Sequence, residues 1–286
     1  MLKWQIGDVS VTRVVEMEMA FAYNPDGAFL KEATPDKLRD MPWLFPHFVT
    51  DDGSLKMSIH ALLVRAPGLN LVVDTCVGND KPRGLLGGQA LQTGFLQSLE
   101  EAGCKPDAVD AVVCTHLHVD HVGWNTMLKD GKWVPTFPQA RYLIGKQEYE
   151  FWSRDGDAEQ QTILSDSVKP IFDQGLATLV EMDHRISAEI SLTPTPGHTP
   201  GHVSVMIESK GQRALITGDM LHHPCQFGHP EWSPTFDSDP VAGASMRRSV
   251  MERVAGQPIL VIGTHFAAPT AGRVKRDGGA FKFDVA

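Results

Sequence analysis

The chain has few cysteines, no long apolar run and no block of like charge. Its four cysteines are scattered and none belongs to a CxxC pair, which favours free thiols in a reducing compartment over a disulfide framework. No segment approaches the roughly 20 consecutive apolar residues that cross a bilayer. We therefore expect a cytoplasmic protein without a membrane partner.

Charge argues against polyanionic partners. The 286 residues carry a formal net charge of -9, and no stretch is rich in lysine or arginine. Electrostatic binding to nucleic acid or to an anionic membrane needs such a stretch. We expect a small-molecule substrate and no nucleic acid. The chain is long enough to bury roughly three-quarters of its unfolded surface.

The first twenty residues, "MLKWQIGDVSVTRVVEMEMA", alternate apolar and polar side chains. They lack the basic segment followed by an apolar run that marks a secretion signal. The alternation predicts a pair of strands.

Strand-like and helix-like segments take turns along the rest of the chain. Residues 58–76 predict a hairpin that turns at Pro67-Gly68, residues 90–104 a helix, and residues 107–116 a short buried strand. In the second half, strands are predicted within 188–209, 212–223 and 258–266, and helices within 159–175 and 239–256. No linker or repeat interrupts this pattern. We expect one domain, residues 1–286, with two strand-rich halves that divide near residues 147–157.

The stretch "CTHLHVDHVGWN" concentrates His116, His118, Asp120 and His121 in six residues after a predicted strand. Residues at i and i+2 of an extended loop point to one side, so the first two histidines can bind one ion and the other two residues a second. Leaving so many buried polar groups unsatisfied would cost about 1–3 kcal/mol each. A metal site is the interpretation that satisfies them.

Three further polar residues, His198, Asp219 and His265, recur at predicted strand ends in "TPGHTPGH", "TGDM" and "GTHF". Singly each is weak evidence, since a strand-end histidine is more often structural and "TGD" can be a simple turn. Together they supply the ligands that the cluster lacks. Imidazole and carboxylate without cysteine suit two divalent ions, with Zn²⁺ preferred and Mn²⁺ or Fe as alternatives.

In order and spacing, these motifs and the upstream "VVDTC" resemble the metallo-β-lactamase superfamily from about Val72 to His265. The resemblance implies an α+β fold, an αββα sandwich of two mixed β-sheets flanked by helices. It also implies which residues bind each of two metal ions and which residue bridges them. The first metal takes His116, His118 and His198, the second takes Asp120, His121 and His265, and Asp219 bridges them.

Asp219 narrows the choice within the superfamily. True β-lactamases with this motif lack the bridging carboxylate, nuclease relatives add a basic RNA-binding arm, and glyoxalase II proteins add a C-terminal helical extension. The resemblance therefore favours the branch of acyl-homoserine lactonases and methyl parathion hydrolase. A glyoxalase II-like thioesterase stays as an alternative. A di-iron oxidoreductase is a weaker one, because His118 stands where those proteins usually have glutamate.

Several other residues are predicted to support the site. His222 stands where the lactonases of this branch have tyrosine, and is expected to hold the polar end of the substrate. Asp74 would orient a metal ligand from behind, although Cys76 replaces the glycine of the family's common "DTG". His202 is expected to be structural or to support a ligand. His223 is expected in a loop near the mouth of the site.

Aromatic residues in the N-terminal stretch "MPWLFPHF" and near the ligand motifs are candidates for the walls of a substrate pocket, although core packing is the commoner role of such residues. The six aromatic candidates are Trp43, Phe45, Phe48, Phe227, Trp232 and Phe266.

A further expectation is that an N-terminal extension of about residues 17–55 covers the site or forms the contact of a homodimer.

The ligand set predicts the chemistry. Two cations would lower the pKa of a bridging water toward neutrality, and the resulting metal-bridging hydroxide would attack a lactone, carboxylic ester or phosphotriester. Asp120, next to that hydroxide, would accept or pass on a proton. The sequence thus predicts a dinuclear metal-dependent hydrolase.

Overall fold

A computed structural model describes residues 1–285, which fold as two compact units. Met1–Glu16 and Ile59–His184 form the first unit, and Met17–Ser58 and Arg185–Ala286 form the second. The division after His184 corrects the expected one near residues 147–157, because the strand and helices that follow residue 145 continue the first unit.

The first unit is built on a seven-stranded mixed sheet with the order β1-β2-β3-β4-β5-β8-β9. The predicted strand pairs at the N-terminus and at Pro67-Gly68 are present as the antiparallel pairs β1–β2 and β3–β4. The pairs β4–β5, β5–β8 and β8–β9 are parallel. The strands are β1 (Lys3–Ile6), β2 (Val9–Phe21), β3 (Leu55–Ala66), β4 (Leu69–Val73), β5 (Ala111–Cys114), β8 (Arg141–Gly145) and β9 (Ala177–Val180).

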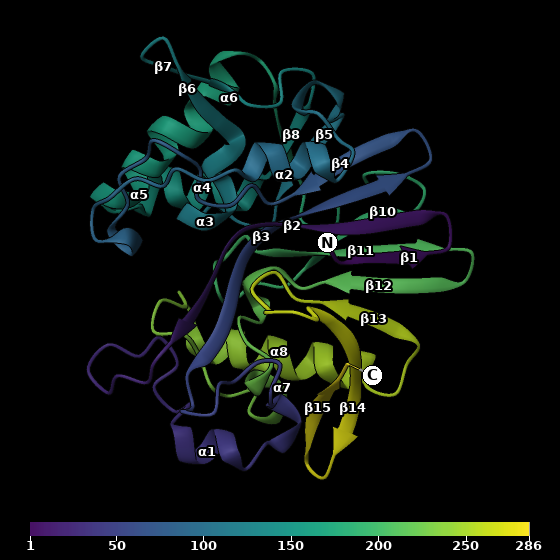
Figure 1. Ribbon diagram of the computed structural model, residues 1–286. Coiled ribbons are helices and arrows are strands. Elements are labelled where there is room, and N and C mark those ends of the chain that lie inside the picture. Colours follow the sequence, from purple (N-terminus) through teal and green to yellow (C-terminus); the bar gives the residue numbers. More distant parts are fainter. Residues whose placement is uncertain (286) are drawn as a thin grey trace. The chain divides into compact units, whose positions relative to one another are not determined.

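The strand that delivers the histidine cluster lies inside this sheet. All four residues of β5, "AVVC", are buried, as expected of a parallel strand covered on both faces. The helix α4 packs against β8 and β9 (Figure 1). The other elements of the unit are α2 (Phe95–Glu101), α3 (Val119–Val122), α4 (Lys146–Asp155), α5 (Ala158–Ile163), a π-helical turn (Leu164–Val168), α6 (Lys169–Asp173), and the hairpin of β6 (Thr126–Lys129) and β7 (Lys132–Pro135).

A six-stranded mixed sheet forms the frame of the second unit, with the order β10-β11-β12-β13-β14-β15. Only the pair β12–β13 is parallel, and it spans the long connection that contains α8 (Pro240–Val254). A predicted metal ligand follows the end of each strand by three residues, Asp219 after β12 and His265 after β13, which places both at the same edge of the sheet. The strands are β10 (Ile190–Pro194), β11 (Val203–Ser209), β12 (Gln212–Ile216), β13 (Ile259–Ile262), β14 (Ala271–Asp277) and β15 (Ala280–Asp284).

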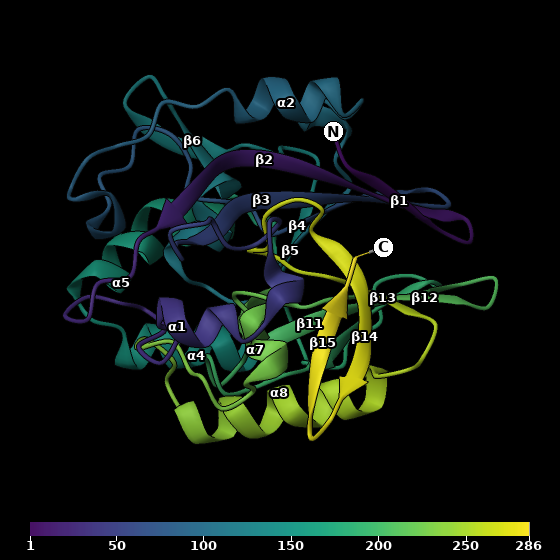
Figure 2. The ribbon, with the colours of Figure 1, turned by 60° about the horizontal axis from the view of Figure 1, so that its bottom comes forward.

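Helix α8 follows from local sequence signals. Asp239 caps its N-terminus by accepting hydrogen bonds from the backbone of Val241 and Ala242, and Pro240 occupies the first turn. Val250, Met251 and Val254 bury its apolar side in the same core as the sheet residues. Figure 2 shows α8 running beside the sheet of the second unit.

The predicted N-terminal extension belongs to this core. Its residues Leu30, Leu38, Leu44 and Phe48 are almost fully buried in the second unit. It contains α1 (Pro35–Arg39), which begins at the N-cap Thr34, and a short 3₁₀ turn (Pro42–Leu44). The segment is therefore anchored by core packing along much of its length.

Lys81 is a fully buried cation in the loop after β4. Its Nζ donates to Thr126 O at 2.9 Å and lies 4.0 Å from the ring centroid of Trp133. Burial is the largest influence on its pKa and lowers it from 10.5 to about 7, opposed chiefly by Asp166.

This shift predicts a pH-dependent stability. Between about pH 7 and 10.5 the unfolded chain binds more protons than the folded chain, so the free energy of unfolding rises with pH, by up to about 1.4 kcal/mol per pH unit. Urea unfolding at several pH values should show this rise in the native protein and lose it in Lys81→Met. The exposed Lys132→Met is the matched control and should keep the rise. An unchanged slope in Lys81→Met would contradict the prediction.

No helix in the described part of the chain combines the length and hydrophobicity needed to cross a bilayer.

Candidate metal centre

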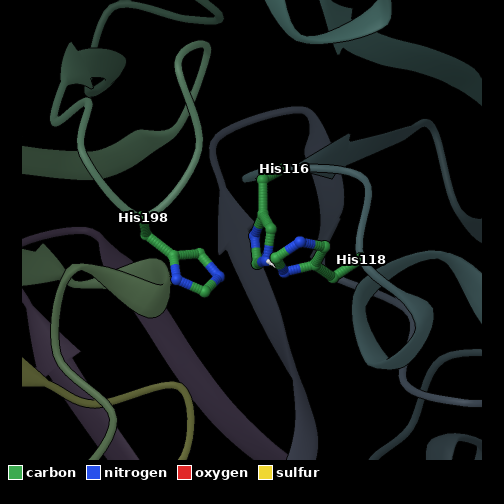
Figure 3. Close-up of side chains that lie close together, drawn as sticks. All are labelled: His116, His118 and His198. Atoms are coloured by element: carbon green, nitrogen blue, oxygen red, sulfur yellow. Dashed lines mark hydrogen bonds between the residues drawn. The ribbon is translucent and has the colours of Figure 1, made fainter. Parts of the chain in front are cut away.

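The histidine cluster of the first unit lies where β5 ends and α3 begins. His118 is the N-cap residue of α3, and its Nδ1 lies 3.0 Å from His116 Nε2 (Figure 3). The rings of His116 and His121 are 4.0 Å apart between centroids. Asp120 Oδ1 lies 3.6 Å from His121 Nε2. These four side chains therefore present imidazole nitrogens and a carboxylate within a small volume.

Asp74, at the end of β4, organises the cluster from behind. Its carboxylate accepts hydrogen bonds from Thr115 N at 2.7 Å and Thr115 Oγ1 at 2.9 Å, and lies 2.9 Å from His121 Nδ1. A hydrogen bond at Nδ1 leaves the Nε2 of His121 as the nitrogen available to a metal. The side chain of Asp74 is only 1% exposed.

The turn after Asp74 shows why the family favours glycine there. Cys76 adopts a left-handed conformation, with φ at 53°, which costs a residue with a side chain more than glycine. Gly123 N donates to Cys76 O at 2.7 Å. A Cβ on Gly123 would lie 1.8 Å from Val77 O, so this close approach of the turn to the histidine segment requires glycine.

Glu16 holds the same turn from β2. Its carboxylate accepts hydrogen bonds from Val77 N at 2.7 Å, Gly78 N at 3.1 Å and Trp124 Nε1 at 2.6 Å. Burial raises the pKa of Glu16, and these donors oppose the rise. No sequence motif marks Glu16, because its partners lie about sixty or more residues away along the chain.

In the second unit, Asp219 follows β12 and lies among three histidines. Its Oδ2 is 3.1 Å from His222 Nε2 and 3.6 Å from His198 Nε2, and its Oδ1 is 3.0 Å from His265 Nε2. The backbone of Asp219 is also held, since its N donates to His202 Nε2 at 2.8 Å. The carboxylate is thus placed to share an ion with several imidazoles.

The approach of His202 to the Asp219 backbone depends on Gly218. A Cβ at Gly218 would lie 2.5 Å from His202 Nε2, and the residue has φ at 54°. The other ring nitrogen of His202 lies 2.8 Å from Thr195 Oγ1. His202 therefore supports the turn that carries Asp219.

His198 and His265 are each oriented through Nδ1. His198 Nδ1 lies 2.8 Å from Asp237 Oδ1, and Asp237 Oδ2 in turn lies 3.3 Å from Arg247 of α8. His265 Nδ1 lies 3.1 Å from Ser58 O. In both histidines Nε2 is left facing Asp219. Asp237 does not lie in a recognisable sequence motif. Its contact with His198 joins residues 39 positions apart.

His222 was predicted to contact the substrate. In the structure it also lies close to two of the predicted metal ligands, His198 and Asp219. One ligand atom each of His198, Asp219 and His222 lie within 4.8 Å of one another, a spacing that could hold an ion. The Nδ1 of His222 is buried and has no hydrogen-bond partner among residues 1–285. Its backbone N donates to Gln226 Oε1 at 2.7 Å, which fixes the start of the following turn.

The structure corrects part of the predicted substrate pocket. Phe48, Phe227 and Phe266 expose at most 1% of their surface and pack with Phe283 in the core of the second unit. In this conformation they have no surface to offer a ligand. The commoner role of such residues, core packing, applies to these three.

The other aromatic candidates also contact the core. Trp232 is 3% exposed and stacks on His229 with ring centroids 4.0 Å apart. Trp43 and Phe45 are partly buried against the same core.

His223 is not at a mouth but in the interior. Its Nε2 lies 2.9 Å from Phe48 O, and its Nδ1 accepts from Cys225 N at 3.1 Å. Burial lowers the pKa of His223 to about 4, so its ring is neutral at pH 7 and serves the fold.

Two aromatic residues that were not predicted as site residues contact the predicted ligands. Phe236 lies beside His198 and His222, with ring centroids 5.8 and 5.3 Å away. In the first unit, Trp152 lies 5.2 Å from the ring of His118 and donates to the buried Glu148 at 2.6 Å. No sequence motif marked either residue.

The contact between Asp237 and His198 leads to a prediction. Replacing Asp237 by Asn removes the charge that orients the imidazole, and we expect metal affinity to fall by about 10- to 100-fold. Titration of the metal-free protein with Zn²⁺ measures this directly. Asp239→Asn is the matched control, because Asp239 caps α8 without contacting a predicted ligand. Equal affinities for the native protein and Asp237→Asn would rule out the orienting role.

The donor set fits divalent metal ions. Each unit offers buried imidazole nitrogens close to a carboxylate, and several of the histidines are oriented by a second hydrogen bond at Nδ1, as metal-binding histidines usually are. The four cysteines are all free and buried, and none belongs to these clusters. The chemistry matches Zn²⁺ and similar ions.

Residues 56–262 match the metallo-beta-lactamase superfamily. Since this is more than half of the chain, the protein belongs to that superfamily. An N-acyl homoserine lactonase of Bacillus sp is 27% identical over 166 residues, 58% of this chain and 59% of that protein. The N-acyl homoserine lactonase AttM of Rhizobium radiobacter is 26% identical over 203 residues, 59% of this chain and 73% of that protein. The chain thus spans about three-fifths of the first relative.

Solved structures show the same fold over almost the whole chain. A hydrolase of the beta lactamase superfamily, AbOPH, matches with a TM-score of 0.81 and 23% identity, covering 100% of this chain and 97% of the other. AidC, a dizinc quorum-quenching lactonase, matches with a TM-score of 0.78 and 21% identity, covering 98% and 95%. The predicted αββα fold with two mixed sheets is therefore confirmed.

Proposed function

We propose that this protein is a hydrolase that uses two divalent metal ions to cleave a lactone, carboxylic ester or phosphotriester. The observation that carries the proposal is the buried Asp219 carboxylate with the Nε2 atoms of three histidines at 3.0–3.6 Å. A carboxylate with several imidazoles directed at it is suited to bridging two cations.

We infer that the two clusters supply one dinuclear site. His116, His118 and His198 would hold the first ion, and Asp120, His121 and His265 the second, with Asp219 shared. Membership of the superfamily and the order of these residues along the chain support this assignment. Zn²⁺ is the proposed metal, in line with the donor chemistry and with a fold neighbour described as a dizinc enzyme.

When bound, such ions supply a hydroxide near neutral pH and polarise the oxygen under attack. The residues of this chain perform the remaining tasks. Asp74 and Asp237 keep two ligand imidazoles in the correct orientation. Asp120, which is partly exposed, would accept the proton of the attacking hydroxide and pass it to the leaving oxygen as the attacked group breaks down. His222 is proposed to hold the polar end of a substrate.

The relatives support an ester-like substrate. Those reported above are named N-acyl homoserine lactonases, and lactones, carboxylic esters and phosphotriesters all place negative charge on one oxygen during hydrolysis. The chain offers no cluster of basic residues for a polyanion. These two facts favour a neutral or weakly charged substrate.

Two measurements on the purified protein test the proposal. Elemental analysis should find two divalent ions per chain. A screen should find hydrolysis among homoserine lactones, aryl esters and paraoxon-like triesters. A preference for a β-lactam or a glutathione thioester by more than about tenfold in kcat/KM, some 1.4 kcal/mol, would overturn the choice of substrate. A redox-active iron pair with oxygen-dependent activity would overturn the hydrolytic assignment.

A further inference from the structure

Three phenylalanines of the second unit form a continuous series of ring contacts, which we name the aromatic wall: Phe21, Phe29 and Phe236. The rings of Phe21 and Phe29 are 5.8 Å apart in an edge-on arrangement. Those of Phe29 and Phe236 are 6.3 Å apart and nearly parallel, at 19°. The wall joins the end of β2 and the N-terminal segment to the loop that precedes α8.

The aromatic wall is exposed where other phenylalanines of its unit are buried. Phe236 is 48% exposed and Phe21 is 39% exposed, whereas Phe48, Phe227 and Phe266 are at most 1% exposed. Large apolar side chains that lie together and stay exposed often mark a binding surface. The wall therefore has free ring surface that the fold itself does not use.

The backbone on both sides of Phe236 is anchored. Thr235 N donates to Phe29 O at 2.9 Å, which ties the two segments of the wall together. Asp237 binds His198 and lies against Arg247. Because Phe236 lies between two anchored neighbours, its ring is presented by a fixed backbone.

The wall also touches the predicted catalytic residues of its unit. The ring of Phe236 lies edge-on to His222 at 5.3 Å and 71°, and edge-on to His198 at 5.8 Å and 82°. Phe29 lies 6.5 Å from His222. A substrate group held by His222 would therefore have ring surface beside it.

We propose that the aromatic wall binds a planar aryl group of the substrate, so that the protein prefers aryl lactones and aryl esters to alkyl ones of equal size. This inference rests on the proposed hydrolytic function. Aromatic pairs attract through edge-on and offset-stacked geometries beyond the burial of apolar area, and a saturated chain lacks that attraction. Phe236 is the specificity-determining residue of this wall.

A matched pair of lactones tests the preference. Dihydrocoumarin and octahydrocoumarin share a six-membered lactone ring, which is fused to a benzene ring in the first and to a cyclohexane ring of equal size in the second. Intrinsic reactivity cancels when each variant is compared with the native protein on the same substrate. For Phe236→Ala we expect kcat/KM to fall about tenfold more on the aryl lactone than on the alkyl lactone. Phe236→Leu, which keeps apolar bulk without a ring, should show a similar selective loss.

Leu128→Ala is the control, because Leu128 is an exposed apolar residue of the first unit, 43% exposed, and belongs to neither cluster. It should retain the native ratio of the two activities. Equal losses on both lactones in Phe236→Ala would overturn the aryl preference and leave the hydrolytic function standing.

A binding measurement separates the two proposals in the absence of turnover. The zinc-loaded protein is titrated calorimetrically with 3-phenylpropionate and 3-cyclohexylpropionate, which differ only in the aromaticity of the ring. We expect tighter binding of the phenyl compound, and loss of that difference in Phe236→Ala. Equal binding of the two acids to the native protein would overturn the aromatic wall as an aryl site. Failure to hydrolyse any lactone, with the phenyl preference intact, would overturn only the proposed function.

Discussion

Replacing Asp219 by Ala should remove one of the two proposed metal ions and lower kcat/KM by at least about 100-fold. The side chain is the proposed bridge, and its loss would destroy the geometry on which an activated water depends. In the native protein this carboxylate lies 3.0–3.6 Å from the Nε2 atoms of His198, His222 and His265. Elemental analysis and steady-state kinetics on the same preparation measure both effects.

Asp219→Asn is the sharper variant. It keeps the shape of the side chain and the backbone contact to His202, but replaces one oxygen by an amide that cannot bridge two cations. We expect it to lose nearly as much activity as Asp219→Ala while unfolding at a similar temperature to the native protein. An Asp219→Asn protein with two ions and full activity would refute the bridging role.

Removing the metals by chelation should abolish activity and lower the melting temperature. The buried imidazoles and carboxylates then lose their ligand, and an ion present at 100 times its Kd contributes about 2.7 kcal/mol of stability. For a chain of this size that corresponds to a loss of at least about 5 °C. Differential scanning calorimetry before and after dialysis against a chelator gives the shift, and re-addition of Zn²⁺ or Mn²⁺ should restore both properties.

Specificity of the chelation effect is checked with Asp219→Ala, whose melting temperature should fall less on chelation because it holds less metal to lose. Full activity in a preparation shown by elemental analysis to contain no divalent ion would disprove the metal-dependent mechanism.

Much of the fold could be predicted from periodicity and turn residues. The alternation in the first twenty residues predicted β1 and β2, Pro67-Gly68 predicted the β3–β4 turn, and the segment after Asp239 predicted α8. These signals are local, since a strand, a turn or a helix cap is set by residues a few positions apart. The division into units was placed wrongly near residues 147–157, because contacts between strands far apart in sequence decide it.

The predicted metal ligands carried a signal because several stood together in one short motif. Asp74 also stood in a motif, but Asp237, which orients a ligand, and Glu16, which holds the turn after Asp74, did not. Asp237 meets His198 from 39 positions away, and Glu16 meets Val77 from 61 positions away. Their type and local sequence look like those of many surface carboxylates.

Aromatic residues show the same limit. Phe227 and Phe266 stood near site motifs and Phe48 stood in the N-terminal aromatic stretch, yet all three proved to be core, whereas Phe236 was not predicted and contacts two of the predicted site histidines. Proximity in sequence says little about which face of a loop a ring occupies. Packing decides that, because a ring moves to whichever side can exclude water around it.

The sequence by itself determined the superfamily, the order of the strands and helices, and the kinds of atoms available to bind a metal, because each of these is encoded in short motifs and local periodicity. Only the tertiary structure decided which carboxylate orients His198, that His223 is a buried neutral residue, and that Phe236 rather than Phe266 offers an exposed ring. Those properties depend on distances between residues far apart in the chain, and such distances exist only after the core has packed.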